Sequence, residues 1–274
     1  MNKTATIILN RNLPDVTDRL YEKISGNDGD LTDIYVLESG SDKEKLSKYT
    51  SWYADWPEAL ENGLRYQRGM NYALLKLIES GVFENYEAFF LLTNDTELED
   101  KAVIAPLLEV LEKHPRVGIL SPCSQKWGEK FLFKKQDVLY FSFIHNTAYF
   151  LRREFIESIM QKTSRSYMNL LFDGDNFRGF GSEEELIAKG YINDWASAIT
   201  NKVYAEENES YLLNYPNIIK TEDNEENMRL YIKEGEEWMF SKYGFKSKWE
   251  MHLYVKLFYD QFFKYHPHFK KYKI

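Results

Sequence analysis

One stretch of this sequence runs from an apolar segment directly into a cluster of oxygen-bearing side chains. Residues 89–92 read FFLL and the polar run TNDTE follows at 93–97, with Asn94 and Asp95 at its centre. A hard divalent cation such as Mg²⁺ or Mn²⁺ prefers a few carboxylates together with the oxygens of a substrate diphosphate. Asp95 at the end of a strand is therefore a candidate metal ligand. The same residues also suit a plain turn in which Thr96 caps the next helix, so the residues alone leave both interpretations open.

A second acidic centre lies at 179–186, which reads GFGSEEEL. It contains three consecutive acids, Glu183, Glu184 and Glu185, and three acids at a helix start are what the helix dipole favours. Three charged residues shortly before this turn either line the same cleft or belong to a solvated loop: Asp173, Asp175 and Arg178.

Alternating strand and helix patterns fill the first 120 residues. Short apolar runs predict strands at 6–9, 34–37, 88–92 and 117–120. Apolar residues at helical intervals predict helices at 13–24, 70–78 and 103–111. Such strand–helix–strand units build a mainly parallel sheet, in which ligands bind at the carboxyl ends of the strands. A candidate site is therefore expected where three loops meet, at 10–14, 38–42 and 93–97.

The alternation weakens after Pro122. Apolar runs follow at 138–144 and 147–151, then a helix candidate at 152–160. The acidic segment from Glu206 to Glu237 suggests an extended connection before a last helical region. From 241 to 274 the charge balance reverses, with eight Lys against Glu250 and Asp260.

The run LLTNDTE at 91–97 resembles the LLNNDTE signature of glycosyltransferase family 2, the inverting enzymes of GT-A fold. In that family this is the DxD-type motif, and the resemblance implies that Asp95 binds the metal on the nucleotide-sugar diphosphate. Thr93 is the one departure, at a position where the family has Asn or Asp.

Other landmarks of the family follow in the same order. Residues 10–12 resemble its first polar turn, and ESGSD at 38–42 resembles its DNGSxD turn, with Glu38 as the first acid. The segment 63–71 resembles its NxGxxxGxN segment. The resemblance implies that the following residues hold the donor: Asn10, Arg11, Glu38, Asp42, Gly69, Asn71, Asn94 and Asp95.

The acids at 183–185 resemble the family's GxEDxDL stretch, which lies beside the acceptor. Aligning Leu186 with the leucine of that motif makes Glu183 the general base and Glu185 the later acid, whereas a shift of one residue nominates Glu184. The family often adds a metal-binding His after a late strand. Here Glu206 stands in that region, so either it replaces the imidazole or the metal shell closes without it.

The resemblance predicts an α/β protein with a Rossmann-like, mixed and mainly parallel GT-A sheet flanked by helices, and a helical C-terminal extension. Residues 1–204 would form the GT-A domain, with a nucleotide-sugar half at 1–122 and an acceptor half at 123–204, and 205–274 would pack on it. The predicted activity is inverting, metal-assisted transfer of a sugar from a nucleotide-sugar donor to a glycan or lipid-linked glycan, with Mn²⁺ or Mg²⁺. A sugar-phosphate nucleotidyltransferase is the alternative enzyme, but the loop at 10–14 has no Gly for a phosphate loop. A non-catalytic carbohydrate-binding or scaffold protein of the same fold is the other alternative.

Composition and charge exclude several classes of protein and partner. A formal charge of -8 argues against nucleic acid as a partner, because phosphate binding needs a dense cationic surface. A single cysteine, Cys123, excludes a disulfide scaffold, and the absence of any long apolar run predicts a cytoplasmic protein without a membrane span. The C-terminal stretch 247–264 carries a broad apolar helical face beside a basic stripe. That face could pack on the chain's own core, on a second copy in a homo-oligomer, or on an anionic membrane surface.

Overall fold

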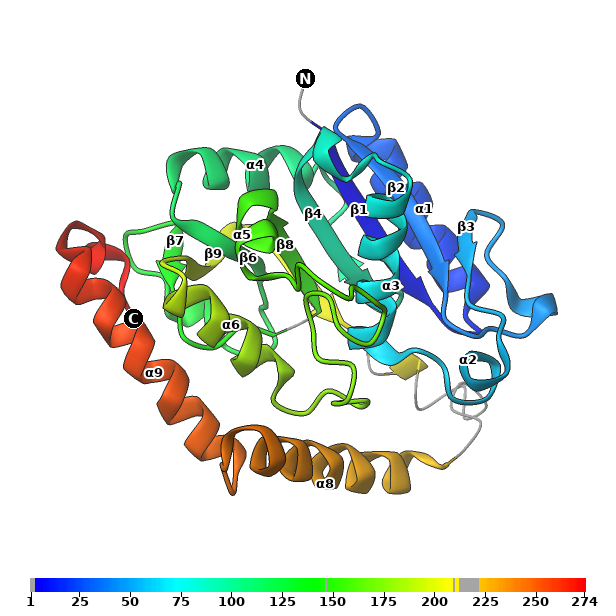
Figure 1. Ribbon diagram of the computed structural model, residues 1–274. Coiled ribbons are helices and arrows are strands. Elements are labelled where there is room, and N and C mark those ends of the chain that lie inside the picture. The colour runs from blue at the N-terminus through cyan, green and yellow to red at the C-terminus, as the bar shows by residue number, and fades with distance from the viewer. Residues whose placement is uncertain (1–2, 146, 209, 212–221) are drawn as a thin grey trace.

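A single curved β-sheet runs through the molecule, and helices flank it (Figure 1). The computed structural model describes residues 3–145, 147–208, 210–211 and 222–274. Within these residues the sheet has nine strands in the order β3-β2-β1-β4-β8-β6-β9-β5, and β7 pairs with β9. The nine strands are β1 (Lys3–Asn10), β2 (Thr32–Glu38), β3 (Thr50–Tyr53), β4 (Tyr86–Thr93), β5 (Thr96–Leu98), β6 (Val117–Cys123), β7 (Val138–Tyr140), β8 (Ala148–Arg152) and β9 (Ala196–Glu207).

The helices that flank the sheet follow the strands in chain order. They are α1 (Pro14–Asp28), α2 (Pro57–Asn62), α3 (Arg65–Glu79), α4 (Ile104–Lys113), α5 (Arg153–Ile159), α6 (Ser182–Ile192), α8 (Asn224–Tyr243) and α9 (Lys248–Tyr265). Short 3₁₀ turns lie at Lys43–Lys45, Phe83–Asn85, Glu129–Phe131 and Pro267–Tyr272. Among the described helices none is long and apolar enough to cross a bilayer.

The first half of the sheet is parallel, and its register brings the predicted loops together. Strand β1 pairs in parallel with both β2 and β4, so Asn10 lies opposite Glu38 and Leu9 lies opposite Thr93. The central strands β1 and β4 bury apolar residues on both faces, as parallel strands covered by helices do. Strand β8 then pairs antiparallel with β4 and β6, which makes the sheet mixed. The predicted mixed α/β sheet flanked by helices is thus confirmed.

The prediction of an extended connection from Glu206 to Glu237 is wrong for its second half, which is helical. Residues 209 and 212–221 lie outside the described residues, but α8 starts at Asn224 and includes Glu237. Asp223 caps the helix by accepting from the backbone N–H of Glu226, and Gly244 ends it in a left-handed conformation. The helix is polar on most of its surface, so no apolar period marked it in the sequence.

The C-terminal extension packs on the same body. Figure 1 shows α8 along one edge of the molecule and α9 turning up beside α6. Gly235 of α8 lies against Phe180, where a Cβ would meet the Phe180 Cβ at 2.4 Å. Tyr259 of α9 donates to the backbone oxygen of Tyr140 at 3.0 Å. The extension is therefore tied both to the loop before α6 and to strand β7.

Candidate active site

The end of β1 and the turn after β2 form one buried hydrogen-bond network around Glu38. Its carboxylate accepts from the Asn10 amide at 2.9 and 3.1 Å, from the Ser41 hydroxyl at 2.6 Å, from the Ser47 N–H at 2.8 Å and from the Thr50 hydroxyl at 3.0 Å. No part of Glu38 is exposed. Glu38 was predicted to hold the donor; in the structure its carboxylate bonds to other residues of the chain and positions Asn10.

Asn10 links this hydrogen-bond network to the polar motif at the end of β4. Its side-chain oxygen accepts from the amide of Asn94 at 2.9 Å and from the N–H of Leu13 at 3.3 Å. Asn94 is half-buried, whereas Asn10 is fully buried. The structure therefore brings the three predicted loops together. Of Asn10, Glu38 and Asn94, only Asn94 reaches the surface.

Arg11 and Asp42 lie on either side of an interlocked pair of turns. Asn12 adopts a left-handed conformation, with φ of 58°, and its side-chain oxygen accepts from the Asp42 N–H at 2.8 Å. Arg11 donates to the backbone oxygen of Glu61 at 2.8 Å, and burial, with the nearby charge of Arg65, lowers the pKa of Arg11 to about 10. Arg11 and Asp42 are both half-buried, and they follow the carboxyl ends of β1 and β2.

Gly69 and Asn71 make contacts inside the protein. A Cβ on Gly69 would approach Leu9 Cδ1 to 2.6 Å, so a glycine lets α3 pack tightly on β1. The Asn71 oxygen accepts from the N–H groups of Leu171 and Phe172, and its amide donates to the backbone oxygens of Tyr167 and Phe172. Asn71 is fully buried. Both residues were predicted near the donor; in the structure Gly69 packs against Leu9 of β1, and Asn71 fixes the loop at 167–172.

Asp95 has an unused carboxylate oxygen. It forms the turn between β4 and β5, and its backbone oxygen accepts from the Asn208 N–H at 3.0 Å. Its Oδ1 is buried and has no hydrogen-bond partner. Burial raises the pKa of Asp95, although the hydrogen bond from the Thr93 side chain opposes this. A desolvated carboxylate with a free oxygen is an arrangement that a bound cation stabilises.

The residues around Asp95 fit a cation that is held mainly by substrate. Among the described residues no three His, Cys, Asp or Glu side chains gather as a metal site. Glu206 accepts from the Ser124 hydroxyl at 2.8 Å and from the Gln125 N–H at 2.6 Å, so both of its carboxylate oxygens are bonded to the loop after β6. One carboxylate with a nearby Thr93 hydroxyl matches the way Mg²⁺ is bound through one or two acids plus substrate phosphates.

The three acids at the start of α6 have three different environments. Glu185 is fully engaged, because it pairs with Lys189 at 3.2 Å and Lys242 at 2.7 Å and accepts from the Tyr243 hydroxyl at 2.5 Å. Glu184 is 1% exposed and pairs with Lys248 at 3.4 Å. Consecutive helical residues point in different directions, which explains how neighbours acquire such different partners.

Glu183 has no ion-pair partner among the described residues. It is half-buried, and its Oε2 has no hydrogen-bond partner. Burial, reinforced by the adjacent charge of Glu184, raises its pKa to about 7. A carboxylate with a pKa near neutrality and a free oxygen is suited to general base catalysis. Glu184 also has a buried Oε2 without a hydrogen-bond partner, but it is paired with Lys248 and only 1% exposed. Of the two acids that the sequence nominated as catalytic, Glu183 is therefore the more accessible.

Three tyrosines that the sequence analysis missed surround Glu183. Tyr66 comes from α3, Tyr149 from β8 and Tyr231 from α8. Burial raises the pKa of all three, and the charge of Glu183 raises each further. The Tyr66 hydroxyl is buried without a partner, so it is a hydrogen-bond donor available at this position. The three residues are 165 positions apart at most, and no sequence pattern links them.

An arginine cluster lies between α3, the loop before α6 and α8. Glu222 accepts from Arg65 at 2.9 Å and from Arg178 at 2.7 Å, and its side chain is 6% exposed. The guanidinium carbons of Arg65, Arg68 and Arg178 lie 5.5, 4.6 and 5.6 Å from the ring centre of Phe177. Glu58 also pairs with Arg68 and Glu234 with Arg178, so three glutamates balance the three arginines of this cluster, which lies near Arg11.

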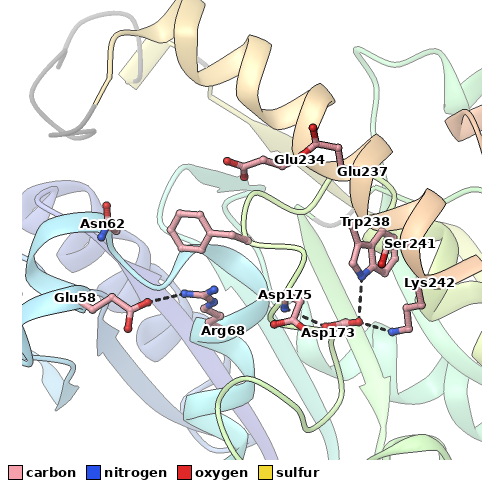
Figure 2. Close-up of a pocket in the computed structure, with 11 residues that line it drawn as sticks. Glu58, Asn62, Arg68, Asp173, Asp175, Glu234, Glu237, Trp238, Ser241 and Lys242 are labelled. Atoms are coloured by element: carbon pink, nitrogen blue, oxygen red, sulfur yellow. Dashed lines mark hydrogen bonds and ion pairs between the residues drawn. The ribbon is translucent and has the colours of Figure 1, made fainter.

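Asp173 and Asp175 line an open pocket of about 780 Å³, shown in Figure 2, and Arg68 and Phe177 of the arginine cluster also line it. Glu58 and Asn62 of α2 form one side of it, and Glu234, Glu237, Trp238, Ser241 and Lys242 of α8 form the other. Asp173 accepts from the indole N–H of Trp238 at 3.0 Å and from Lys242. Arg178 is absent from its lining and belongs to the arginine cluster.

His145, a lone histidine on the acceptor side, has aromatic neighbours. Its ring lies 3.9 Å from that of Trp127 and 4.8 Å from that of Phe143. Burial, followed by the charge of Lys248, lowers its pKa to about 4, so the imidazole is neutral at ordinary pH.

Comparison with known proteins identifies the fold. The sequence matched no protein-family model and no curated protein. Among solved structures, GalNAc-T7 with UDP, GalNAc and Mn²⁺ matches 99% of this chain and 58% of its own, at 14% identity and a TM-score of 0.53. S. aureus TarS matches 88% of this chain and 44% of its own, at 10% identity and a TM-score of 0.50.

A third structure, the mannosyltransferase PcManGT from Pyrobaculum calidifontis with GDP-Man and Mn²⁺, matches 72% of this chain and 54% of its own at 12% identity and a TM-score of 0.48. The chain thus spans about half the length of these proteins. At these identities the likeness concerns the fold, and it agrees with the sheet and helices described above: the chain has a GT-A-type glycosyltransferase fold.

Proposed function

We propose that this protein is a glycosyltransferase that moves a sugar from a nucleotide-sugar donor to a hydroxyl of a glycan or lipid-linked glycan, with inversion. The observation that carries the proposal is Glu183, a half-buried acid with a free oxygen and a pKa of about 7 on a GT-A-type fold. An inactive relative that only binds carbohydrate gains nothing from keeping an acid desolvated in this way, because the burial costs stability.

The proposed reaction is a single displacement. The acceptor hydroxyl gives its proton to the Glu183 carboxylate while its oxygen forms a bond to the anomeric carbon of the donor sugar. The bond from that carbon to the diphosphate oxygen breaks, and the nucleoside diphosphate leaves with the electron pair. Attack from the face opposite the leaving group inverts the anomeric centre. Because Glu183 must be ionised to accept the proton, the rate is expected to rise with pH through about 7.

Asp95 and the neighbouring loops supply the donor side of the proposal. Asp95 would hold Mn²⁺ or Mg²⁺, which when bound neutralises charge on the leaving diphosphate. Asn94 and Asp42 reach the surface at the carboxyl edge of the sheet, and Arg11 lies at the same edge. Glu38 and Asn10 would not touch the donor but would hold these loops in position.

Nucleotide-dependent stabilisation tests this proposal without knowledge of the acceptor. The melting temperature of the chain would be measured with UDP, dTDP, GDP and CMP, each with and without Mn²⁺. One nucleotide at about a hundred times its dissociation constant should raise the melting temperature by about 5–10 °C, and only with the metal. Absence of a shift with every nucleotide would contradict the transferase and favour a scaffold.

Two variants separate the donor side from the acceptor side. Asp95→Asn should lose the metal-dependent shift, because the amide cannot replace the anionic ligand. Glu183→Gln should keep the shift, since Glu183 is assigned to the acceptor. Release of nucleoside diphosphate from the matching nucleotide sugar should be lost in both variants. A Glu183→Gln variant that turns over like the wild type would refute the base assignment.

A further inference from the structure

Helix α9 carries two apolar faces, and the chain covers one of them. The inner face packs on α6 and β7 through residues that are at most 3% exposed: Met251, Val255, Tyr259, Phe262 and Phe263. The outer face presents Trp249, Leu253 and Leu257, which are 67%, 48% and 56% exposed. Residues spaced by four positions form a single row on a helix, so these three side chains make one continuous apolar strip.

Lysines without an ion-pair partner occur in and around α9, within the residues that the structure describes. Three of the eight lysines after residue 240 are ion-paired: Lys242 with Glu185, Lys248 with Glu184 and Lys273 with Asp260. The remaining five are exposed and have no ion-pair partner within the part of the chain that the structure describes: Lys246, Lys256, Lys264, Lys270 and Lys271. Helical spacing places Lys256 and Lys264 on the same exposed face as Leu253 and Leu257. The acids of this segment are Glu250 and Asp260, and Asp260 is paired with Lys273. With eight Lys against these two acids, residues 241–274 are positive although the whole chain is at -8.

We propose that the Trp249, Leu253 and Leu257 row docks on a membrane surface that contains anionic lipids. An interfacial helix buries an apolar row at the boundary between headgroups and acyl chains, and lysines beside it are attracted to anionic headgroups. Tryptophan is the side chain that prefers this boundary. At 1.5 Å per residue the row is about 12 Å long, so α9 lies along the surface.

The charge pattern favours a membrane over a second copy of this chain. A two-fold dimer puts the same patch opposite itself, so unpaired lysines of one copy would face those of the other. A lipid surface satisfies the lysines and the apolar row together. The docking rests on the exposed face of α9 and not on the proposed transfer reaction, although Lys248 links the start of this helix to Glu184 of the candidate site.

Sedimentation of the full chain with lipid vesicles tests the docking. The protein should sediment with mixed phosphatidylcholine–phosphatidylglycerol vesicles and much less with phosphatidylcholine alone. The triple variant Trp249→Gln, Leu253→Gln, Leu257→Gln should lower the partition coefficient about tenfold or more. The matched control Met228→Gln, Ile232→Gln removes two apolar residues of α8 that are 52% and 43% exposed, and it should bind like the wild type.

A charge variant and two controls complete the experiment. Lys256→Gln, Lys264→Gln should weaken binding and reduce its sensitivity to salt, because these lysines supply the electrostatic part. All altered side chains are exposed, so the melting temperature should stay at the wild-type value. Equal binding by the triple variant and the wild type, or no preference for the anionic vesicles, would overturn the proposal. So would light scattering that shows a dimer which the triple variant dissolves, because a second copy would then cover the face.

Discussion

Replacing Glu183 by glutamine should make the protein more stable while removing its activity. Glutamine has nearly the same shape but cannot ionise. In the wild type the pKa of Glu183 rises from 4.5 to about 7 on folding, because burial and then the charge of Glu184 disfavour the ionised form. The folded state therefore loses stability as pH rises from 4.5 to about 7 and recovers none above it.

The size of the effect follows from that shift. Each pKa unit corresponds to about 1.4 kcal/mol, so full ionisation of Glu183 costs the folded state about 3 kcal/mol. Glu183→Gln should therefore raise the free energy of unfolding by up to about 3 kcal/mol near pH 8, or about 6–12 °C in melting temperature. Near pH 4 the acid is protonated in both states, and the variant should match the wild type.

Urea unfolding at both pH values would measure this, with Glu185→Gln as the matched control on the same helix. Glu185 is stabilised by Lys189, Lys242 and Tyr243, so its replacement should lower stability by about 1–3 kcal/mol. Turnover should fall about 10²- to 10⁴-fold in Glu183→Gln. If this variant is no more stable than the wild type near pH 8, Glu183 is not desolvated, and its assignment as a poised base fails.

Three further substitutions test the surroundings of the site. Asn71→Ala removes four hydrogen bonds to the loop at 167–172 and should lower the free energy of unfolding by about 2–4 kcal/mol in urea. Gly63→Ala should cost about 1–2 kcal/mol, since φ is +71° and the new Cβ would meet Arg11 Nη1 at 1.8 Å; weaker nucleotide binding in calorimetry should accompany it. Lys248→Gln removes a charge that favours ionised Glu183, so the acid limb of the pH–rate profile should move to higher pH. An unchanged limb would show that the lysine does not act on this carboxylate.

The sequence predicted the sheet well because its strands are buried on both faces. Apolar runs of four or five residues ending in polar turns marked β1, β2, β4 and β6, and parallel pairing then places their ends together. The polar helix α8 escaped prediction because its contacts with the body come from a few residues such as Gly235 and Trp238. Periodicity detects an apolar face, and a helix that lacks one is invisible to it.

Residue type alone does not show whether a polar side chain contacts a ligand or bonds within the chain. Glu38 and Asn71 occupy positions at which a ligand contact was expected, and both are fully buried with their polar atoms bonded within the chain. A turn motif fixes where such a residue lies along the chain. Whether the side chain points to the surface or inward depends on neighbours such as Ser47 and Leu171, which the motif does not include.

The choice among three consecutive glutamates shows the same limit at the candidate site. Glu183, Glu184 and Glu185 are the same residue type, so the sequence alone does not distinguish them. Aligning the family motif in two registers makes either Glu183 or Glu184 the general base. The structure separates them through Lys242 and Lys248, which lie about sixty residues later in the chain. Lys242 pairs with Glu185 and Lys248 with Glu184, whereas Glu183 has no ion pair among the described residues and has a raised pKa. The C-terminal extension thus selects the proposed base by pairing with the other two acids.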